Sequence, residues 1–141
     1  MAIIRVGELI SGRLIYIGFE DNVIKAAILM RENNISSLLV KHKGDFVSIV
    51  TEKDIINKVV AEELYPGDVK VGDIMSKDLF TVSKNESIEE AAKLMRKKGV
   101  RRLVVLEDKR IVGIITETDI AKHLKAIVGG APNKGDIERY F

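Results

Sequence analysis

Two short polar stretches, one in each half of the chain, place a hydroxyl and a carboxylate close together in the sequence, where an apolar strand is expected to end. Residues 113–120 read GIITETDI and residues 48–55 read SIVTEKDI, so that in both a threonine stands three residues before an aspartate. An aspartate carboxylate can accept two hydrogen bonds from a sugar, and the first N–H groups of a following helix attract phosphate. Both stretches are therefore candidate sites for a sugar or a phosphate.

The same spacing also suits a purely structural role. A threonine N-cap accepts a hydrogen bond from the N–H three residues later, and an acidic residue at that position can bond back to the cap. Asp119 and Asp54 would then replace the more usual glutamate of a capping box. Capping and binding are compatible, because the threonine can cap the helix while the aspartate turns outward, so both interpretations stay open.

The two stretches belong to an internal repeat that covers most of the chain. Residues 6–63 align with residues 71–128 at a constant offset of 65 without a gap, and 18 of the 58 aligned positions are identical. Such self-similarity indicates an architecture built from two copies of one unit. We therefore expect the two polar stretches to occupy equivalent places in two similar folds.

Each copy is predicted to contain an entry turn of helix followed by the order β-α-β-β-α. In the first copy the entry turn is expected at 6–10 and the strands near 14–17, 38–41 and 46–50. In the second copy the corresponding ranges are 71–75, 79–82, 103–106 and 111–115. The long helices should begin at Asp21 and at 86–87 and end at Asn34 and Gly99. The closing helices should open at Thr51 and Thr116.

These patterns predict an α+β fold made of two small repeats. A unit of 58 residues buries little apolar surface alone, so the repeats are expected to pack together through their sheets. We place the first repeat at residues 1–65, the second at 66–130 and a C-terminal tail at 131–141. The turn-rich residues 64–68 connect the repeats.

Composition narrows the function classes. The 141 residues are 46% apolar and 31% charged, carry a net charge of +2 and include no cysteine, which excludes disulfides, thiolate zinc sites and a cysteine nucleophile. The sequence contains no Ser-His-Asp set, HExxH or P-loop motif, so we expect neither an enzyme nor a metal site. With no signal peptide pattern or membrane-length apolar run, a cytoplasmic location without membrane contact is expected.

Taken together, three motifs resemble those of a tandem pair of CBS domains, also called a Bateman module. They are the entry VGELIS or VGDIMS, the AA-LMR helix followed by GVRRLVVLED, and GIITETDI, which matches the family pattern of Gly, two apolar residues, Thr or Ser, any two residues and Asp. The resemblance covers residues 6–128. It implies two repeats related by a pseudo-two-fold axis, with two related clefts between them.

The resemblance also implies a function. CBS pairs commonly bind AMP, ADP, ATP or S-adenosylmethionine, often dimerise as a flat disk, and regulate an attached enzyme, channel or transporter. These 141 residues contain no such domain, and we expect a stand-alone regulatory module that needs no cofactor beyond its adenosyl ligand. It would form a homodimer and signal by conformational change to an unknown regulated protein.

The family pattern places the stronger cleft around Asp119, which would hold the ribose. Thr116 would contact ribose or phosphate, Arg101 would face the phosphate, and Ile114 would line the slot for the base. The first repeat would complete this cleft with Glu8, Arg13, Ile35, Ser36 and Ser37.

A weaker cleft is expected around Asp54. Its other members would be Thr51, Ile49, Val100, Arg102, Asp73 and Lys77. Ser48 stands where the family pattern has glycine, and Ser36-Ser37 stand where the second repeat has Arg101-Arg102. Losing the arginine pair removes charge at the phosphate position, where each well-formed contact contributes about 1.5–3 kcal/mol.

Two other functions remain as alternatives. A ligand-free structural module would fill its clefts with its own side chains and act in dimerisation or docking. Nucleic-acid binding would use the basic residues Arg96, Lys97, Lys98, Arg101 and Arg102. The small net charge and the scarcity of aromatic residues make nucleic acid the least favoured partner.

Overall fold

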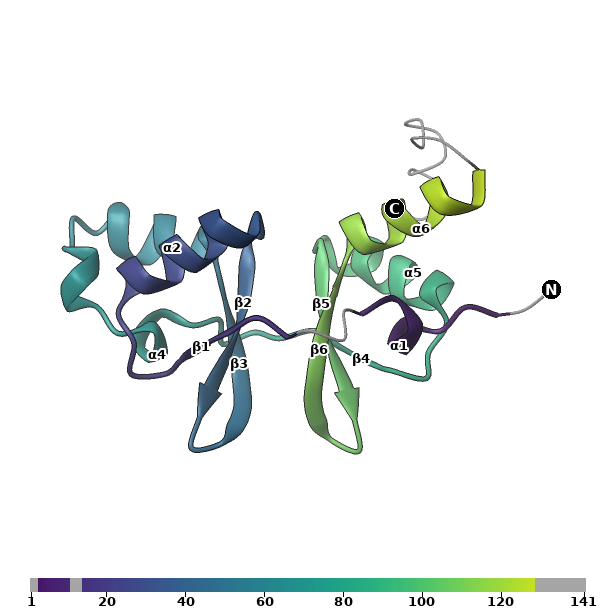
Figure 1. Ribbon diagram of the computed structural model, residues 1–141, viewed down its shortest axis with the longest axis horizontal. Coiled ribbons are helices and arrows are strands. Elements are labelled where there is room, and N and C mark those ends of the chain that lie inside the picture. Colours follow the sequence, from purple (N-terminus) through teal and green to yellow (C-terminus); the bar gives the residue numbers. More distant parts are fainter. Residues whose placement is uncertain (1–2, 11–13, 129–141) are drawn as a thin grey trace. The chain divides into compact units, whose positions relative to one another are not determined.

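The computed structural model describes residues 3–10 and 14–128, with side chains up to residue 124 in the last helix. It contains two compact units: unit 1 comprises Met1–Gly12 and Phe80–Phe141, and unit 2 comprises Arg13–Leu79. Each unit has one three-stranded sheet and its own helices (Figure 1). The predicted α+β class with two β-α-β-β-α repeats is confirmed.

The elements follow the predicted order in both units. Unit 2 contains β1 (Tyr16–Gly18), α2 (Val23–Asn33), β2 (Ser37–His42), β3 (Asp45–Thr51), α3 (Glu52–Ile55), a π-helix η1 (Ile56–Val60), a 3₁₀ turn η2 (Pro66–Asp68) and α4 (Val71–Ile74). Unit 1 contains α1 (Val6–Leu9), β4 (Thr81–Ser83), α5 (Ile88–Lys98), β5 (Arg102–Glu107), β6 (Arg110–Thr116) and α6 (Glu117–Val128).

The two sheets have the same topology. β1 runs parallel to β2, and β2 pairs antiparallel with β3. β4, β5 and β6 repeat this arrangement. Each hairpin carries a bulge at the equivalent place, between Val40 and Lys41 and between Val105 and Leu106. The predicted strands are all present, although β1 and β4 begin two residues later than expected.

The long helices start and stop at polar caps. The Asn22 side chain accepts the N–H of Lys25 at the start of α2, and Ser87 caps α5 in the same way. The expected start at Asp21 was wrong by one residue, because Asp21 instead accepts the N–H of Gly18. Both predicted ends are confirmed, since Asn34 and Gly99 adopt left-handed conformations with φ of 52° and 66°.

Each unit has its own apolar core. In unit 2 the core residues Val23, Ala26 and Met30 of α2 pack against the sheet, as the helical spacing predicts. In unit 1 the corresponding side chains come from α5, and Ile120 of α6 joins them. The strands β2 and β3 in one unit, and β5 and β6 in the other, contribute further fully buried side chains to these cores.

Each core is completed by the entry helix of the other repeat. α4, which begins the second repeat in sequence, buries Val71 in unit 2. A hydrogen bond from the Val71 N–H to Asp21 O at 2.8 Å holds the backbone of α4 against this unit. α1, which begins the first repeat, buries Val6 in unit 1, where Val6 N–H bonds to Glu86 O at 2.8 Å. The compact units therefore exchange their entry helices relative to the sequence repeats.

A glycine in α4 makes this docking close. A Cβ on Gly72 would lie 2.5 Å from the ring of Phe19, which stacks on His42 with ring centroids 4.2 Å apart. Unit 1 replaces this aromatic pair with an ion pair between Lys84 and Glu107 at the equivalent positions. The two units therefore fix the same corner of the fold by different chemistry.

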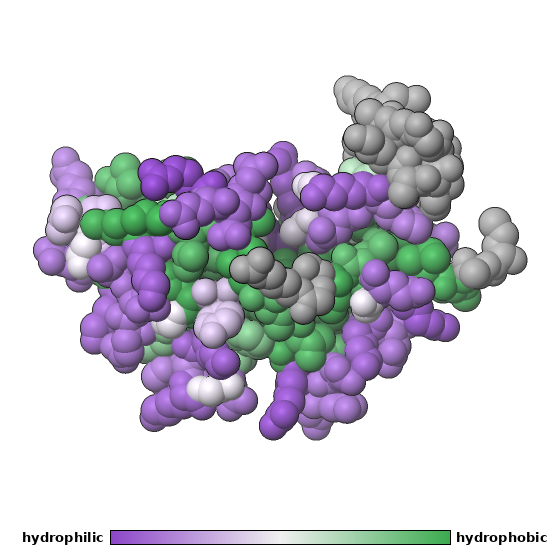
Figure 2. Space-filling view, in the orientation of Figure 1, coloured by the Kyte–Doolittle hydropathy of each residue, from purple (hydrophilic) through white to green (hydrophobic). Residues whose placement is uncertain are grey.

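The hairpin tips are tight two-residue turns with hydrophilic residues, seen as purple surface at the lower edge of Figure 2. In the β2–β3 turn Lys43 and Gly44 have φ of 51° and 87°. In the β5–β6 turn Asp108 and Lys109 have φ of 49° and 68°. These positive values match the turn type that fits the twist of a hairpin, but a lysine at the second position is strained where Gly44 is not.

Replacing Lys109 by glycine should therefore stabilise the protein. We expect the free energy of unfolding of Lys109→Gly to rise by about 1 kcal/mol, because the left-handed conformation costs about 1–2 kcal/mol for a residue with a Cβ. The matched control is Gly44→Lys, which should lower the free energy of unfolding by a similar amount. The cost is the backbone strain alone, because no atom lies within 4 Å of a Cβ at this position. Urea unfolding measures both variants, and a lower free energy of unfolding for Lys109→Gly or a higher one for Gly44→Lys would contradict the turn assignment.

Candidate functional site

The Thr116–Asp119 pair forms a capping box where β6 passes into α6. Asp119 Oδ2 accepts the backbone N–H of Thr116 at 2.8 Å and the Thr116 hydroxyl at 3.0 Å. The Thr116 hydroxyl in turn accepts the N–H of Asp119 at 3.2 Å. The capping interpretation is therefore confirmed here. Asp119 is only half-buried, so capping leaves part of its carboxylate on the surface.

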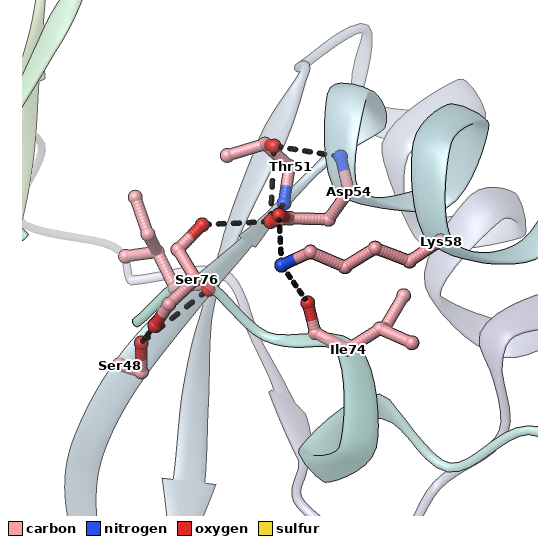
Figure 3. A network of polar contacts seen from close by, with 7 residues as sticks. Ser48, Thr51, Asp54, Lys58, Ile74 and Ser76 are labelled. Carbon is pink, nitrogen blue, oxygen red and sulfur yellow. Dashed lines mark hydrogen bonds and ion pairs between the residues drawn. The ribbon is translucent and has the colours of Figure 1, made fainter. Parts of the chain in front are cut away.

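The Thr51–Asp54 pair forms the same capping box, and Asp54 also bonds to side chains outside the box. Asp54 Oδ2 accepts the N–H and hydroxyl of Thr51 at 2.9 and 3.0 Å, and it also accepts the Ser76 hydroxyl at 2.7 Å. Lys58 Nζ lies 2.9 Å from Asp54 Oδ1 and 2.9 Å from the carbonyl oxygen of Ile74 (Figure 3). Asp54 thus joins the start of α3 to the segment that follows α4.

Burial and charge set the protonation of this carboxylate. Burial by itself raises the pKa of Asp54, but hydrogen bonds from Lys58, Ser76 and Thr51 outweigh it and hold the pKa below its usual value of 3.8. The side chain of Asp54 is 11% exposed, whereas that of Lys58 is 42% exposed. The aspartate is therefore a buried anion whose counter-ion reaches in from the surface.

Ser48, which replaces the glycine of the family pattern, belongs to the same network. Its hydroxyl lies in the sheet and donates to the carbonyl oxygen of Ser76 at 2.6 Å (Figure 3). At the equivalent place in unit 1, Gly113 lies against Ile10, whose Cδ1 would be 3.2 Å from a Cβ on that glycine. The Ser48 departure noted from sequence therefore serves a backbone contact with the entry segment.

The remaining residues predicted for the stronger cleft are divided between the units. Arg101 lies in unit 1 with its side chain 79% exposed and its Nε 3.7 Å from Glu117 at the start of α6. Ile114 is half-buried on β6, and Glu8 on α1 accepts the N–H of Arg5 at 2.6 Å. Arg13 lies outside the residues described.

The three residues that the first repeat was expected to add belong to unit 2. Ile35 packs against its core, Ser37 is buried at the start of β2, and the carbonyl oxygen of Ser36 accepts the N–H of Glu52 at 3.0 Å. Arg101 O accepts the N–H of Glu117 in the same way. These equivalent bonds show that Ser36 and Arg101 hold matching positions beside the two capping boxes. That the two sets form one site stays a prediction.

The set expected around Asp54 is likewise divided. Unit 2 holds Thr51, the buried Ile49 on β3, the exposed Asp73 on α4 and the exposed Lys77. Unit 1 holds the half-buried Val100 and Arg102. Within unit 2, Ile49 O accepts the N–H of Ser76 at 2.8 Å, so Ile49 contacts the same entry segment as Asp54.

A surface hollow of about 500 Å³ in unit 2 shares Lys58 and Ile74 with the Asp54 network. Lys58, the ion-pair partner of Asp54, belongs to its lining. Apolar side chains and two exposed carboxylates form the rest of the lining, which consists of Leu64, Tyr65, Asp68, Val69, Asp73 and Ile74. The predicted residue Asp73 therefore belongs to this hollow.

Sequence reasoning missed three members of the Asp54 network. Lys58 could have been found, because it stands four residues after Asp54 on a predicted helix, which is the spacing of a helical ion pair. Ser76 is 22 residues from Asp54, and no local pattern connects them. Ser48 was noted only as a departure from glycine.

Two further features bear on the class of site. Within 3–10 and 14–128, no group of three or more His, Cys, Asp or Glu side chains is placed to hold a metal ion. No helix in the same part of the chain is long and apolar enough to cross a membrane.

Comparison with known proteins identifies the repeat. A family model described as CBS domain matches residues 6–61 and 71–126. The uncharacterised protein MK0525 of Methanopyrus kandleri is 36% identical over 122 residues, which are 85% of this chain and 62% of that protein. The chain thus spans less than two thirds of that relative's length.

Two solved structures have the same fold. The CBS domain pair of protein MJ0100, in complex with 5′-methylthioadenosine and S-adenosyl-L-methionine, is 26% identical with a TM-score of 0.75, covering 89% of this chain and 99% of that one. A hexameric CBS-CP12 protein from bloom-forming cyanobacteria is 32% identical with a TM-score of 0.71, covering 84% of this chain and 69% of that one.

The Asp54 network predicts a pH-dependent contribution to stability. Because the pKa of Asp54 is lowered on folding, its contribution is fully present above about pH 4, the value of an unfolded aspartate, and is lost as the pH falls through the folded pKa. Asp54→Asn should therefore lower the free energy of unfolding by about 1–3 kcal/mol at pH 7.

The difference between wild type and Asp54→Asn should shrink as the pH falls below about 4, as measured by urea unfolding at several pH values. The exposed Asp78→Asn is the control for loss of a surface charge. A difference that stays constant down to pH 2 would contradict the network.

Proposed function

Because the chain belongs to the CBS domain family, with two copies of the domain in tandem, we propose that it is a regulatory module that binds an adenosine-containing ligand at the β6–α6 junction. The candidates are AMP, ADP, ATP and S-adenosylmethionine. In this role Asp119 accepts hydrogen bonds from the ribose hydroxyls, and the first N–H groups of α6 lie close to the phosphate or carboxylate of the ligand.

The observation that carries this proposal is the state of the Asp119 carboxylate. Its Oδ2 is bonded to Thr116, while no donor among the residues described is recorded on Oδ1. A carboxylate that keeps accepting capacity at a half-exposed helix start can bond to a diol. Arg101 lies near the same helix start, because its side chain is paired with Glu117, the first residue of α6. Its exposed guanidinium can turn towards a phosphate.

The ligand class is supported by a similar protein. The CBS domain pair of MJ0100 was crystallised with two adenosyl compounds, 5′-methylthioadenosine and S-adenosyl-L-methionine. Binding by this chain would change the packing around α6, and a regulated protein would respond to that change by differential affinity for the two states. The proposal assigns this chain a regulatory role and no catalytic one.

Self-association is the second part of the proposal. Ile56 and Val60 of η1 are 56% and 61% exposed, and Leu64 and Tyr65, which follow in the chain, are exposed too; we call these four residues the η1 strip. The second repeat has Ala121 and Lys125 at the positions equivalent to Ile56 and Val60. The hexameric CBS-CP12 protein supports self-association in a chain of this fold. We therefore assign the strip to contact with a second copy, as a homodimer.

Ligand binding should raise the melting temperature, and Asp119 should be needed for it. At a ligand concentration one hundred times the dissociation constant, the free energy of unfolding rises by about 2.7 kcal/mol. We expect at least one of AMP, ADP, ATP and S-adenosylmethionine to give this response in a thermal-shift assay. Asp119→Asn should lose it.

Because Asp119 also caps α6, the readout is the ligand-induced shift and not the starting melting temperature. Asp54→Asn is the matched control and should keep the shift. If none of the four compounds raises the melting temperature of the wild type, the ligand-free structural module becomes the better assignment.

The homodimer should depend on the η1 strip. Val60→Lys introduces the residue of the second repeat and places a charge in an apolar contact, where it must be desolvated. We expect light scattering after size exclusion to give twice the chain mass for wild type and one chain mass for Val60→Lys. Val47→Lys, an exposed valine on β3, should remain dimeric. A monomeric wild type or a dimeric Val60→Lys would contradict the strip as interface.

A further inference from the structure

The Asp54 carboxylate has most of its accepting capacity filled by the chain itself. Ionised carboxylate oxygens offer about four acceptor sites in total. Asp54 receives four donors, namely the Thr51 N–H, the Thr51 hydroxyl, the Ser76 hydroxyl and the Lys58 ammonium. Three of them bond to Oδ2 and one to Oδ1, so a ribose diol that bonds through both hydroxyls would have to displace a donor.

The displacement would also detach a segment of backbone. Residues 74–76 are held over the β3–α3 junction by three further bonds. Lys58 donates to Ile74 O at 2.9 Å, the Ser48 hydroxyl donates to Ser76 O at 2.6 Å, and the Ser76 N–H donates to Ile49 O at 2.8 Å. Removing Lys58 from Asp54 would leave the buried carboxylate without its counter-ion, which is strongly destabilising.

The β6–α6 junction differs at two of these positions. His123 stands where the first repeat has Lys58, and Gly113 stands where it has Ser48. Histidine replaces the long, flexible ammonium group with a shorter imidazole ring, and glycine supplies no hydroxyl. The two differences therefore remove the lysine and one backbone tether while keeping the threonine and aspartate of the capping box.

From this difference we infer that Lys58 occupies the Asp54 position in place of a ligand, and that it thereby limits the chain to one adenosyl ligand. The ammonium takes the place that ligand hydroxyls would take on the carboxylate, and Ser48 and Ser76 hold the entry segment in front of it. The Asp54 position then fastens the segment after α4, and among the residues described the Asp119 position keeps an open carboxylate oxygen. This inference rests on the proposed function, because it sets the number and place of the ligands.

The test is ligand stoichiometry by isothermal titration calorimetry with ATP, AMP and S-adenosylmethionine as separate probes. Wild type should bind one molecule per chain. Asp54→Asn should leave that number unchanged and the dissociation constant within about twofold, whereas Asp119→Asn should abolish binding. The double variant Lys58→His with Ser48→Gly copies the second repeat and should bind a second molecule per chain, which Asp54→Asn in that background should remove.

Two binding outcomes would overturn the inference. Wild type binding two molecules per chain, with one lost in Asp54→Asn, would show that Lys58 does not close the site. The same conclusion follows if the Lys58→His, Ser48→Gly variant still binds one molecule. Binding in Asp119→Asn but not in Asp54→Asn would reverse the assignment of the open and closed positions.

Failure of every probe to bind would count against the proposed function, and a second measurement then decides the inference by itself. If Lys58 and Asp54 act as one unit, Lys58→Met and Asp54→Asn should each lower the melting temperature, and the double variant should lose less than the sum of the two. Lys58→Arg should retain most of the stability. Additive losses would overturn the inference whether or not a ligand is found.

Discussion

The structure depends on the exchange of entry helices between the two sequence repeats. Val6 from the first repeat is fully buried in unit 1, and Val71 from the second is fully buried in unit 2. Antiparallel bridges fix both insertions, between Arg5 and Ser87 and between Asn22 and Lys70. A single repeat therefore lacks part of its own core, which explains why a unit of this size occurs as a pair.

This exchange determines what lies beside the Asp54 capping box. The chain leaving α4 must return towards β4, and in doing so residues 74–76 pass the start of α3. A hydroxyl at Ser76 and an ammonium at Lys58 then reach the same carboxylate. The chemistry of the junction is thus decided by the entry segment together with the helix that the aspartate caps.

Much of this fold could be predicted from the sequence because its signals are local and occur twice. The stripe of Val23, Ala26 and Met30 gave the position of α2, and the spacing of Thr51 and Asp54 gave the start of α3. The helix ends at Asn34 and Gly99 followed from residues that tolerate positive φ. These features depend on neighbours within four residues, which a single sequence displays directly.

Local signals could not predict that each unit takes its entry helix from the other repeat, or that Asp54 is buried and paired with Lys58. Both depend on contacts between residues far apart in the chain, such as Val6 with the α5 core and Ser76 with Asp54. The π-helix η1 is a further example, because its sequence INKVV has no breaker and its wider turn appears only in the structure. The repeat alignment predicted a regular helix there, as in α6.

The comparison of the two junctions shows why a repeated motif need not mean a repeated site. Thr51 and Asp54 make the same cap as Thr116 and Asp119, so the cap alone explains why the motif occurs in both repeats. The two aspartates differ in burial, since Asp54 is buried and Asp119 is half-buried. A carboxylate as buried as Asp54 requires a counter-ion, because an unpaired charge there would be strongly destabilising.

A half-exposed carboxylate such as Asp119 can instead be hydrated, so the fold does not require a partner for its second oxygen. That oxygen is available to a ligand, and water is a partner that ribose hydroxyls can displace at little cost. The same motif is thus consistent with a fastening in one unit and a binding group in the other. The deciding difference is the depth of the aspartate and the presence of a lysine four residues later.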